Sequence, residues 1–396
     1  MEKVLKRIRG FKFAARSSAV KSAGKPDLAL IFSDLPARCA AVFTTNRVKA
    51  APLVVSAPRI RKGLCQAVLI NSGNANACTG EAGLKDALRC SELAAQALGI
   101  SEELVAVSST GIIGRPMPME KLERHIPLLI PMLQPGQAKG VAEAILTTDA
   151  FIKMAAESEE GEGGYRILGI AKGAGMIHPN MATMLAYILT DACVDGAFLN
   201  DALRQAVNRS FNCITVDGDT STNDTVLLLA NGLAENPEIK KEAAAAGFVE
   251  KLTKVCLELA KMIVRDGEGA TKLVRIQVDG AESEAVARTV AKSVATSNLL
   301  KAAFFGADPN WGRVIAAVGY SGAAIDPNRV NIRFDQVLLV ENGQGTGSEA
   351  KDQAHQVMKQ PEFTVTVDLR MGSGSAFYYT SDLTYDYVRI NADYHT

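Results

Sequence analysis

The first half of the chain alternates short apolar runs with amphipathic stretches. Short runs rich in branched side chains predict strands, and apolar positions three or four residues apart predict helices. The acidic, glycine-rich segment 156–164 has neither periodicity, so we expect an exposed loop there. Strands are expected at residues 28–32, 41–44, 66–70, 104–108 and 165–171, and helices at residues 83–98 and 139–146.

The second half repeats this alternation without an internal repeat of fixed period. A mixed order of strands and helices predicts an α/β or α+β protein with layered sheets and helices. A break is expected at Gly247, inside the longest helix. Helices are expected at residues 198–211, 236–265, 285–302 and 348–359, and strands at residues 184–189, 225–229, 274–278, 330–334 and 362–369.

Composition narrows the classes of protein. Lys+Arg and Asp+Glu both number 43, and this balance argues against nucleic acid or an anionic membrane as the main partner. No apolar run approaches the roughly 18 residues of a membrane span. The seven cysteines form no C-x-x-C pair and none stands at a metal-ligand spacing from a histidine, so no metal site is expected. Scattered, reduced thiols predict a cytoplasmic protein.

One glycine-punctuated segment offers candidate chemistry. Gly173, Gly175 and Pro179 precede the pair Ala182-Thr183. A strained turn of this kind would hold the threonine hydroxyl against its own preceding carbonyl, as an N-to-O acyl shift requires. Cleavage would leave a threonine whose free α-amino group is the adjacent base. A glycine-rich turn before a strand usually has no such role, so these residues alone leave both interpretations open.

Longer motifs support the first interpretation. The stretch KGAGMIHPNMATML resembles the cleavage-site signature of the ArgJ family, the bifunctional ornithine acetyltransferases/glutamate N-acetyltransferases of arginine biosynthesis. The resemblance extends over nearly the whole chain. Further matching motifs, in order, are NSGNANACTG, SSTGIIGRPMP, TTDAF, VDGDTSTND, VRDGEGATK, GADPNWGRV and YVRINADYHT.

The resemblance implies a DmpA/ArgJ-like α/β (α+β) fold that cleaves itself between Ala182 and Thr183. The products would be an alpha chain, residues 1–182, and a beta chain, residues 183–396, whose N-terminal threonine is the nucleophile. Family members are typically heterotetramers, two copies of the cleaved unit.

The resemblance also implies a set of site residues. Thr110 and Gly111 correspond to the oxyanion hole, where two donors would contribute roughly 3–4 kcal/mol each in a dry site. By chemistry alone, Thr148 is as good a candidate contact as its neighbour Thr147. The positions that correspond to substrate contacts are Thr147, Lys172, Thr183, Glu268, Asn391 and Thr396.

The implied reaction is ping-pong. Thr183 takes the acetyl group from N-acetylornithine and passes it to glutamate, with no cofactor or metal. Acetyl-CoA is left open as a second acetyl donor. A self-processing amidohydrolase or aminopeptidase, with water as the acceptor, is the alternative, and a non-catalytic binding protein is a third class.

Two other features compete with this interpretation. Asp217-x-Asp219-x-Ser221 approaches a phosphatase motif but lacks its partner motifs. His178 lies five residues before Thr183, where a triad base might be sought, but the free amine makes it unnecessary.

Overall fold

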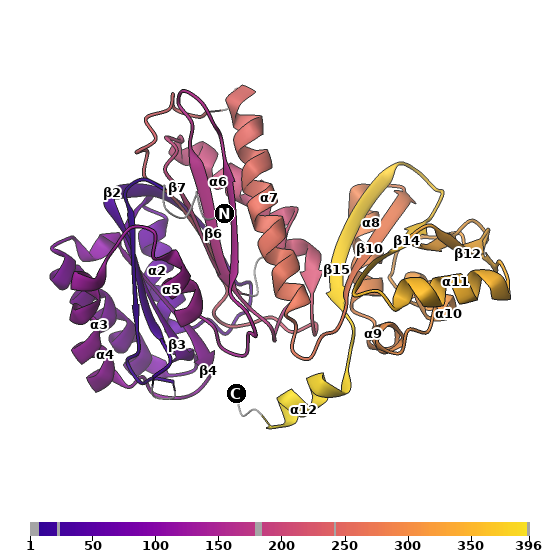
Figure 1. Ribbon diagram of the computed structural model, residues 1–396, viewed down its shortest axis with the longest axis horizontal. Coiled ribbons are helices and arrows are strands. Elements are labelled where there is room, and N and C mark those ends of the chain that lie inside the picture. Colours follow the sequence, from indigo (N-terminus) through magenta and orange to yellow (C-terminus); the bar gives the residue numbers. More distant parts are fainter. Residues whose placement is uncertain (1–7, 22–23, 179–183, 241–242, 394–396) are drawn as a thin grey trace.

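The computed structural model describes residues 8–21, 24–178, 184–240 and 243–393 (Figure 1). It contains two β-sheets, each covered by helices, so the predicted mixed α/β class is confirmed. Helix α7 (Ala243–Arg265) packs on strands of both sheets and lies between them in Figure 1. We refer to the two parts as the first and second regions.

The first region is built on the larger sheet. Its central strand β7 (Leu185–Thr190) is buried at every position because both faces of the sheet are covered. β7 runs parallel to β9 (Thr225–Ala230) and antiparallel to β6 (Arg166–Lys172). The strand order is β4 (Val105–Ile112), β3 (Leu64–Asn74), β2 (Leu28–Phe43), β9, β7, β6 and β5 (Lys153–Ser158), with β1 (Phe11–Arg16) also paired to β2.

A register shift in β2 divides this sheet into two facing layers. Before the shift, residues 28–32 pair with β3, and after it, residues 38–43 pair with β9. Side chains from β3 and β4 then pack against side chains from β7 and β9 in one buried cluster. The ends of β4 and β9 therefore come together across the two layers, although about 110 residues separate them in the chain (225 − 112 = 113).

Helices close both outer faces. On one side, α6 (Gly196–Asn208) and α7 pack on alternate residues of β6, β7 and β9. On the other, α2 (Ala51–Ile60), α3 (Gly80–Leu98) and α4 (Met119–His125) cover β3 and β4. Helix α5 (Ala138–Ala144) joins the cluster between the two layers. The result is a helix–sheet–sheet–helix sandwich.

The second region has its own core between a seven-stranded sheet and four helices. Helix α12 (Tyr385–Asp393) leaves this region and returns toward the first (Figure 1). The strand order is β13 (Gln344–Gly345), β12 (Val337–Glu341), β11 (Asn331–Phe334), β14 (Glu362–Asp368), β10 (Leu273–Ala281), β15 (Gly374–Ser381) and β8 (Ile214–Thr215); the helices are α8 (Glu284–Ala295), α9 (Asn298–Phe305), α10 (Trp311–Gly319) and α11 (Ser348–Met358).

Several predicted boundaries were wrong. The helix expected at 285–302 is two helices, because the Ser297 side chain accepts a hydrogen bond from the backbone N–H of Leu300 and starts a new one. Helix α7 has no break at Gly247, since packing of its buried face overrides the local propensity. The loop expected at 156–164 begins later, because β5 extends to Ser158.

The sequence pattern also missed α2, whose two prolines argue against a helix. Pro52 lies in the first turn, where a missing N–H costs nothing. Within the described ranges, no helix has both the length and the apolar character to cross a membrane.

Candidate active site

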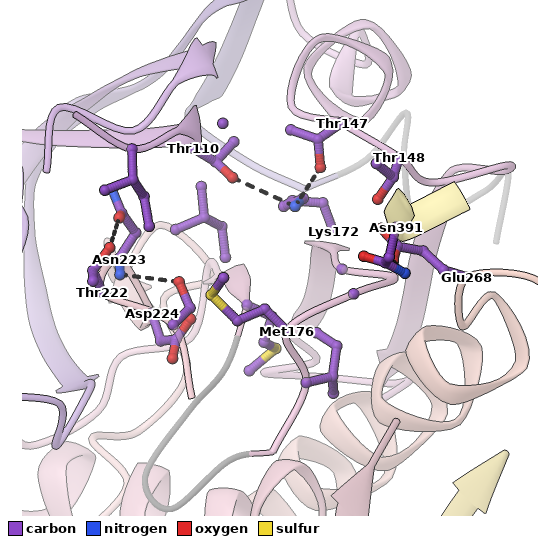
Figure 2. A pocket seen from close by; sticks show the side chains of 18 residues that line it. Thr110, Thr147, Thr148, Lys172, Met176, Thr222, Asn223, Asp224, Glu268 and Asn391 are labelled. Carbon is purple, nitrogen blue, oxygen red and sulfur yellow. Dashed lines mark hydrogen bonds between the residues drawn. The ribbon is translucent and has the colours of Figure 1, made fainter. Parts of the chain in front are cut away.

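A pocket opens where strand ends of the first region converge (Figure 2). The C-terminal ends of β4 and β6 and the N-terminal ends of β7 and β9 reach it, and so do the turn after α5, the turn after α7 and helix α12. Six residues that the family resemblance singled out line it: Thr110, Gly111, Thr147, Lys172, Glu268 and Asn391. Thr148 lines it too, so the structure does not separate it from Thr147.

Thr110 and Gly111 form the last part of β4, and their backbone permits no larger residue than glycine at 111. Gly111 has φ +134°, and a Cβ there would lie 2.4 Å from the carbonyl carbon of Gly73 on β3. The preceding residue, Ser109, is held from the other layer, because its carbonyl accepts a hydrogen bond from Asn223 Nδ2 at 2.8 Å. The Thr110-Gly111 pair is therefore held by both layers of the sandwich.

Lys172 ends β6 and points its ammonium at two threonines. Its Nζ donates to Thr147 Oγ1 at 2.7 Å and to Thr110 Oγ1 at 3.4 Å, as Figure 2 shows. Burial lowers the pKa of Lys172, and Asp149, whose carboxylate lies 3.8 Å from Nζ, opposes that shift. A lysine held this way presents a cation to an anionic ligand group.

Asp149 organises this part of the pocket. Its carboxylate accepts hydrogen bonds from the backbone N–H of Gly173 at 2.6 Å and of Thr147 at 3.0 Å, and pairs with Lys153 Nζ at 2.7 Å. Burial by itself would raise the pKa of Asp149, but Lys172 and Lys153 hold it well below its usual range. Asp149 is thus a buried anion that orients both Thr147 and Lys172.

Glu268, in the turn between α7 and β10, and Asn391, on α12, meet at the pocket. Asn391 Nδ2 on α12 donates to Glu268 Oε2 at 2.8 Å. A Cβ on Gly175 would lie 2.5 Å from the Glu268 carboxylate, so the glycine makes room for this acid. Glu268 supplies a carboxylate that a cationic ligand group can pair with.

Three predicted residues, Ala182, Thr183 and Thr396, lie outside the described residues. Met184, which follows Thr183 in the chain, lines the pocket, and its carbonyl accepts a hydrogen bond from the backbone N–H of Thr225.

The approach to the Ala182–Thr183 bond is held by the segment that resembled a phosphatase motif. The Asp217 carboxylate accepts hydrogen bonds from the backbone N–H groups of Met176 at 2.6 Å and Ile177 at 2.8 Å. Burial raises the pKa of Asp217, which those two hydrogen bonds partly oppose. We therefore assign Asp217 a backbone-holding role.

His178 does not line the pocket. Its Nδ1 lies 3.1 Å from Thr215 Oγ1, and burial lowers its pKa to about 4.

Sequence reasoning missed two acids: Asp224, which lines the pocket, and Asp149, whose carboxylate lies 3.8 Å from Lys172 Nζ. Both stand inside motifs that were recognised, TTDAF and VDGDTSTND, but burial and charge partners were the signals needed to select them. Asp224 lines the pocket at the start of β9, and its side chain is buried.

Comparison with known proteins shows the family of the chain. The sequence profile of the ArgJ family matches residues 12–396. The arginine biosynthesis bifunctional protein ArgJ of Syntrophotalea carbinolica is 62% identical over 391 residues, covering 98% of this chain and 100% of that protein. The protein of the same name from Geobacter sulfurreducens is 53% identical over 391 residues, again covering 98% and 100%.

A solved structure gives the same family. The crystal structure of the arginine biosynthesis bifunctional protein argJ from Bacillus halodurans is 43% identical and superposes with a TM-score of 0.51. The match covers 52% of this chain and 98% of that one. The chain therefore belongs to the ArgJ family of arginine-biosynthesis acyltransferases, as its ordered motifs predicted.

Proposed function

We propose that this enzyme transfers the acetyl group of N-acetylornithine to glutamate through an acetyl ester on Thr183. The observation that carries the proposal is the convergence of Thr110, Gly111, Lys172 and Glu268 on one pocket. Met184, bonded directly to Thr183, lines that same pocket. An acyl-transfer site needs a nucleophile, oxyanion donors and a substrate clamp at one place, and these residues supply the last two.

The chemistry follows in two half-reactions. The Thr183 hydroxyl attacks the acetyl carbonyl, its proton passes to the α-amino group, and Thr110 and Gly111 donate to the oxyanion. The C–N bond breaks, the amine takes the proton, and ornithine leaves. The amine of glutamate then attacks the ester carbonyl, and the Thr183 hydroxyl is restored as N-acetylglutamate forms.

The clamp fits both amino acids. Lys172 and Thr147, 2.7 Å apart, suit the α-carboxylate that N-acetylornithine and glutamate share, and Asn391 and Thr396 would complete its site. Glu268 suits the ammonium group of the ornithine side chain. The same site could receive acetyl-CoA as a second donor, and it needs neither a metal nor another cofactor.

The nucleophile is released by cleavage between Ala182 and Thr183. Strands from both sides of this bond share the first sheet, so residues 1–182 and 183–396 would stay packed together after the cut. The matched Bacillus halodurans chain supports such a cut, since 98% of it corresponds to only about half of this chain. We further propose a cytoplasmic heterotetramer, two copies of this cleaved pair.

Mass spectrometry of the intact, denatured protein tests the cleavage. We expect fragments of residues 1–182 and 183–396. Thr183→Ala should leave one full-length chain without acetyl transfer, whereas Thr289→Ala, on the exposed face of α8, should behave like the wild type. A Thr183→Ala protein that still transfers acetyl groups would overturn Thr183 as the nucleophile.

The acceptor is tested by measuring ornithine release with and without glutamate. Release that requires glutamate and matches N-acetylglutamate formation supports a transferase. Release at the same rate without glutamate would show a hydrolase instead. Replacing N-acetylornithine with acetyl-CoA then decides whether a second donor is used.

A further inference from the structure

Two buried carboxyl groups differ in their surroundings: Asp224 lines the pocket, and Asp149 lies beside the pocket residue Lys172. Asp149 has two backbone N–H donors and the ammonium groups of Lys153 and Lys172 around it. Asp224 is 2% exposed, and its Oδ2 has no hydrogen-bond partner among the residues that the structure describes. Buried polar atoms in folded proteins are nearly always paired, so an unpaired one in a pocket wall calls for a partner that enters the pocket.

Lys172 is the cation whose charge acts on Asp224, but its ammonium group already has other partners. Lys172 Nζ donates to Thr147 Oγ1 at 2.7 Å and lies 3.8 Å from Asp149. Figure 2 shows Asp224 across the pocket from Thr147, Thr148 and Glu268, next to Asn223 and Met176. Lys172 therefore influences Asp224 through its charge, while its hydrogen bonds go to Thr110 and Thr147.

The backbone holds Asp224 in place. Its carbonyl accepts a hydrogen bond from the backbone N–H of Thr44 at 3.0 Å. The neighbouring Asn223 spans the two layers, because its Nδ2 donates to the carbonyls of Ala75 at 2.6 Å and Ser109 at 2.8 Å. A side chain on such a support has a preset position when a ligand arrives.

Burial raises the pKa of Asp224 well above its ordinary value, while Ser221, Lys172 and Thr44 oppose the shift. A carboxyl group keeps its proton below its pKa, so a raised pKa extends the neutral form toward neutral pH. Besides Asp224, the ionisable side chains that line the pocket among the described residues are Lys172 on β6 and Glu268 after α7, and Asp149 lies next to Lys172. Two acids pushed in opposite directions by their surroundings are the usual sign of two different roles.

We propose that Asp224 acts as a neutral carboxylic acid whose hydroxyl donates a hydrogen bond to an oxygen atom of the amino-acid substrate. A protonated carboxyl has one O–H donor, and the acceptor is a carbonyl or carboxylate oxygen, both of which the proposed substrates carry. The identity of that substrate rests on the proposed function. Asp149, in contrast, stays ionised and holds Lys172.

Two variants, Asp224→Asn and Asp224→Ala, distinguish a hydrogen-bond donor at this position from an ionised carboxylate that acts as a base. The asparagine is neutral, similar in shape and able to donate, so its KM for N-acetylornithine at neutral pH should stay within a few-fold of the wild type. The alanine lacks the donor, and its KM should rise about tenfold, the effect of one buried hydrogen bond. If Asp224→Asn loses activity as completely as Asp224→Ala, the carboxylate form is required and the proposal is overturned.

The pH profile supplies a readout that a merely structural role would not change. Raising the pH ionises Asp224 and removes its donor, so wild-type kcat/KM should fall on the alkaline side. Asp224→Asn has no proton to lose and should lack that limb. An unchanged alkaline limb in Asp224→Asn would contradict the proposal.

Infrared spectroscopy tests the protonation state of Asp224 without substrate. Its result is therefore valid even if the enzyme does not catalyse the proposed acetyl transfer. The difference spectrum between wild type and Asp224→Asn at neutral pH should show the carbonyl stretch of a protonated carboxyl group. Asp219→Asn, an exposed acid in the same loop, is the matched control and should leave that band in place. A difference spectrum with only a carboxylate band would overturn the proposal.

Discussion

Two lysines, Lys153 in the first region and Lys301 in the second, are the most deeply buried of the described lysines, and they have different partners. Lys153, at the start of β5 in the first region, lies between the carboxylates of Asp149 and Asp266. Lys301, on α9 in the second region, donates to Thr380 Oγ1 at 3.0 Å and to Ser381 Oγ at 3.1 Å. Lys153 therefore has ionic partners in direct contact, whereas the groups that touch Lys301 are uncharged.

This difference shows how partners decide the charge of a buried group. Burial lowers the pKa of Lys301 to about 7, and the fields of Asp382 and Asp217 only partly oppose it. The Lys301 backbone carbonyl also accepts a hydrogen bond from the backbone N–H of Leu383, at the connection that leads to α12. The first region thus uses a buried ionic cluster to hold its pocket, and the second uses a weakly charged lysine to hold a chain connection.

Lys153→Met should give the largest effect, because it removes the cation that lies between the carboxylates of Asp149 and Asp266. Breaking a buried ion pair from one side costs about 3–5 kcal/mol, and we expect a loss of this size in the free energy of unfolding. Acetyl transfer should fall roughly 100-fold, since Asp149 no longer holds Lys172 in position. Urea denaturation and steady-state kinetics measure the two effects.

The control for this change is Lys12→Met, which removes an exposed pair with Asp34. Its cost should stay below about 1 kcal/mol, with activity unchanged. Equal losses of unfolding free energy in Lys153→Met and Lys12→Met would show that the buried ion pairs stabilise the protein no more than an exposed pair does.

Lys301→Met should lower the free energy of unfolding by less, about 1–2 kcal/mol at neutral pH. The variant loses the hydrogen bonds of the ammonium group, but it also avoids the unfavourable burial of an amine. The unfolded chain keeps the Lys301 proton up to about 10.5, and the native protein only up to about 7. Between these values the unfolded state binds more protons, so wild-type stability gains a term that rises with pH. That rise should be absent in Lys301→Met when unfolding is measured across this range. An identical pH dependence in both proteins would mean that Lys301 stays charged.

Asp266→Asn should give the smallest effect, about 1 kcal/mol or less. Burial raises the pKa of Asp266, so this acid contributes less negative charge than Asp149 does. Lys153 keeps its 2.7 Å contact with Asp149, and the asparagine oxygen still accepts from the backbone N–H of Ala150. Thermal unfolding and kinetics measure the change. A loss as large as that of Lys153→Met would show that both carboxylates are needed at once.

The sequence predicted β3, β4, β6, β7 and β9 because they are largely buried apolar runs, but it divided β2 into two strands and missed β5. It failed where a single residue decides a boundary, as at Ser297, or where packing overrides propensity, as at Gly247. The two facing layers of the first sheet could not be predicted from the sequence, because they depend on one register shift in β2 that no local sequence pattern indicates.

For the site, the motifs were sufficient to name residues and insufficient to rank them. Thr110, Lys172 and Glu268 came from separate motifs, and the structure brings them to one pocket. Asp217 and Asp224 stood in one motif, yet one holds backbone amides and the other lines the pocket. The amino-acid sequence of the motif does not distinguish the roles of these two acids.

The amino-acid sequence by itself determined the family, the expected nucleophile and the types of side chain available to the reaction. The tertiary structure decided the surroundings of each acid, which lower the pKa of Asp149 and raise that of Asp224. Asp149 has Lys153 and Lys172 beside it, whereas Asp224 is buried and its own Oδ2 has no hydrogen-bond partner among the described residues. Charge state depends on burial and on neighbours that arrive from distant parts of the chain, and only the folded arrangement supplies them.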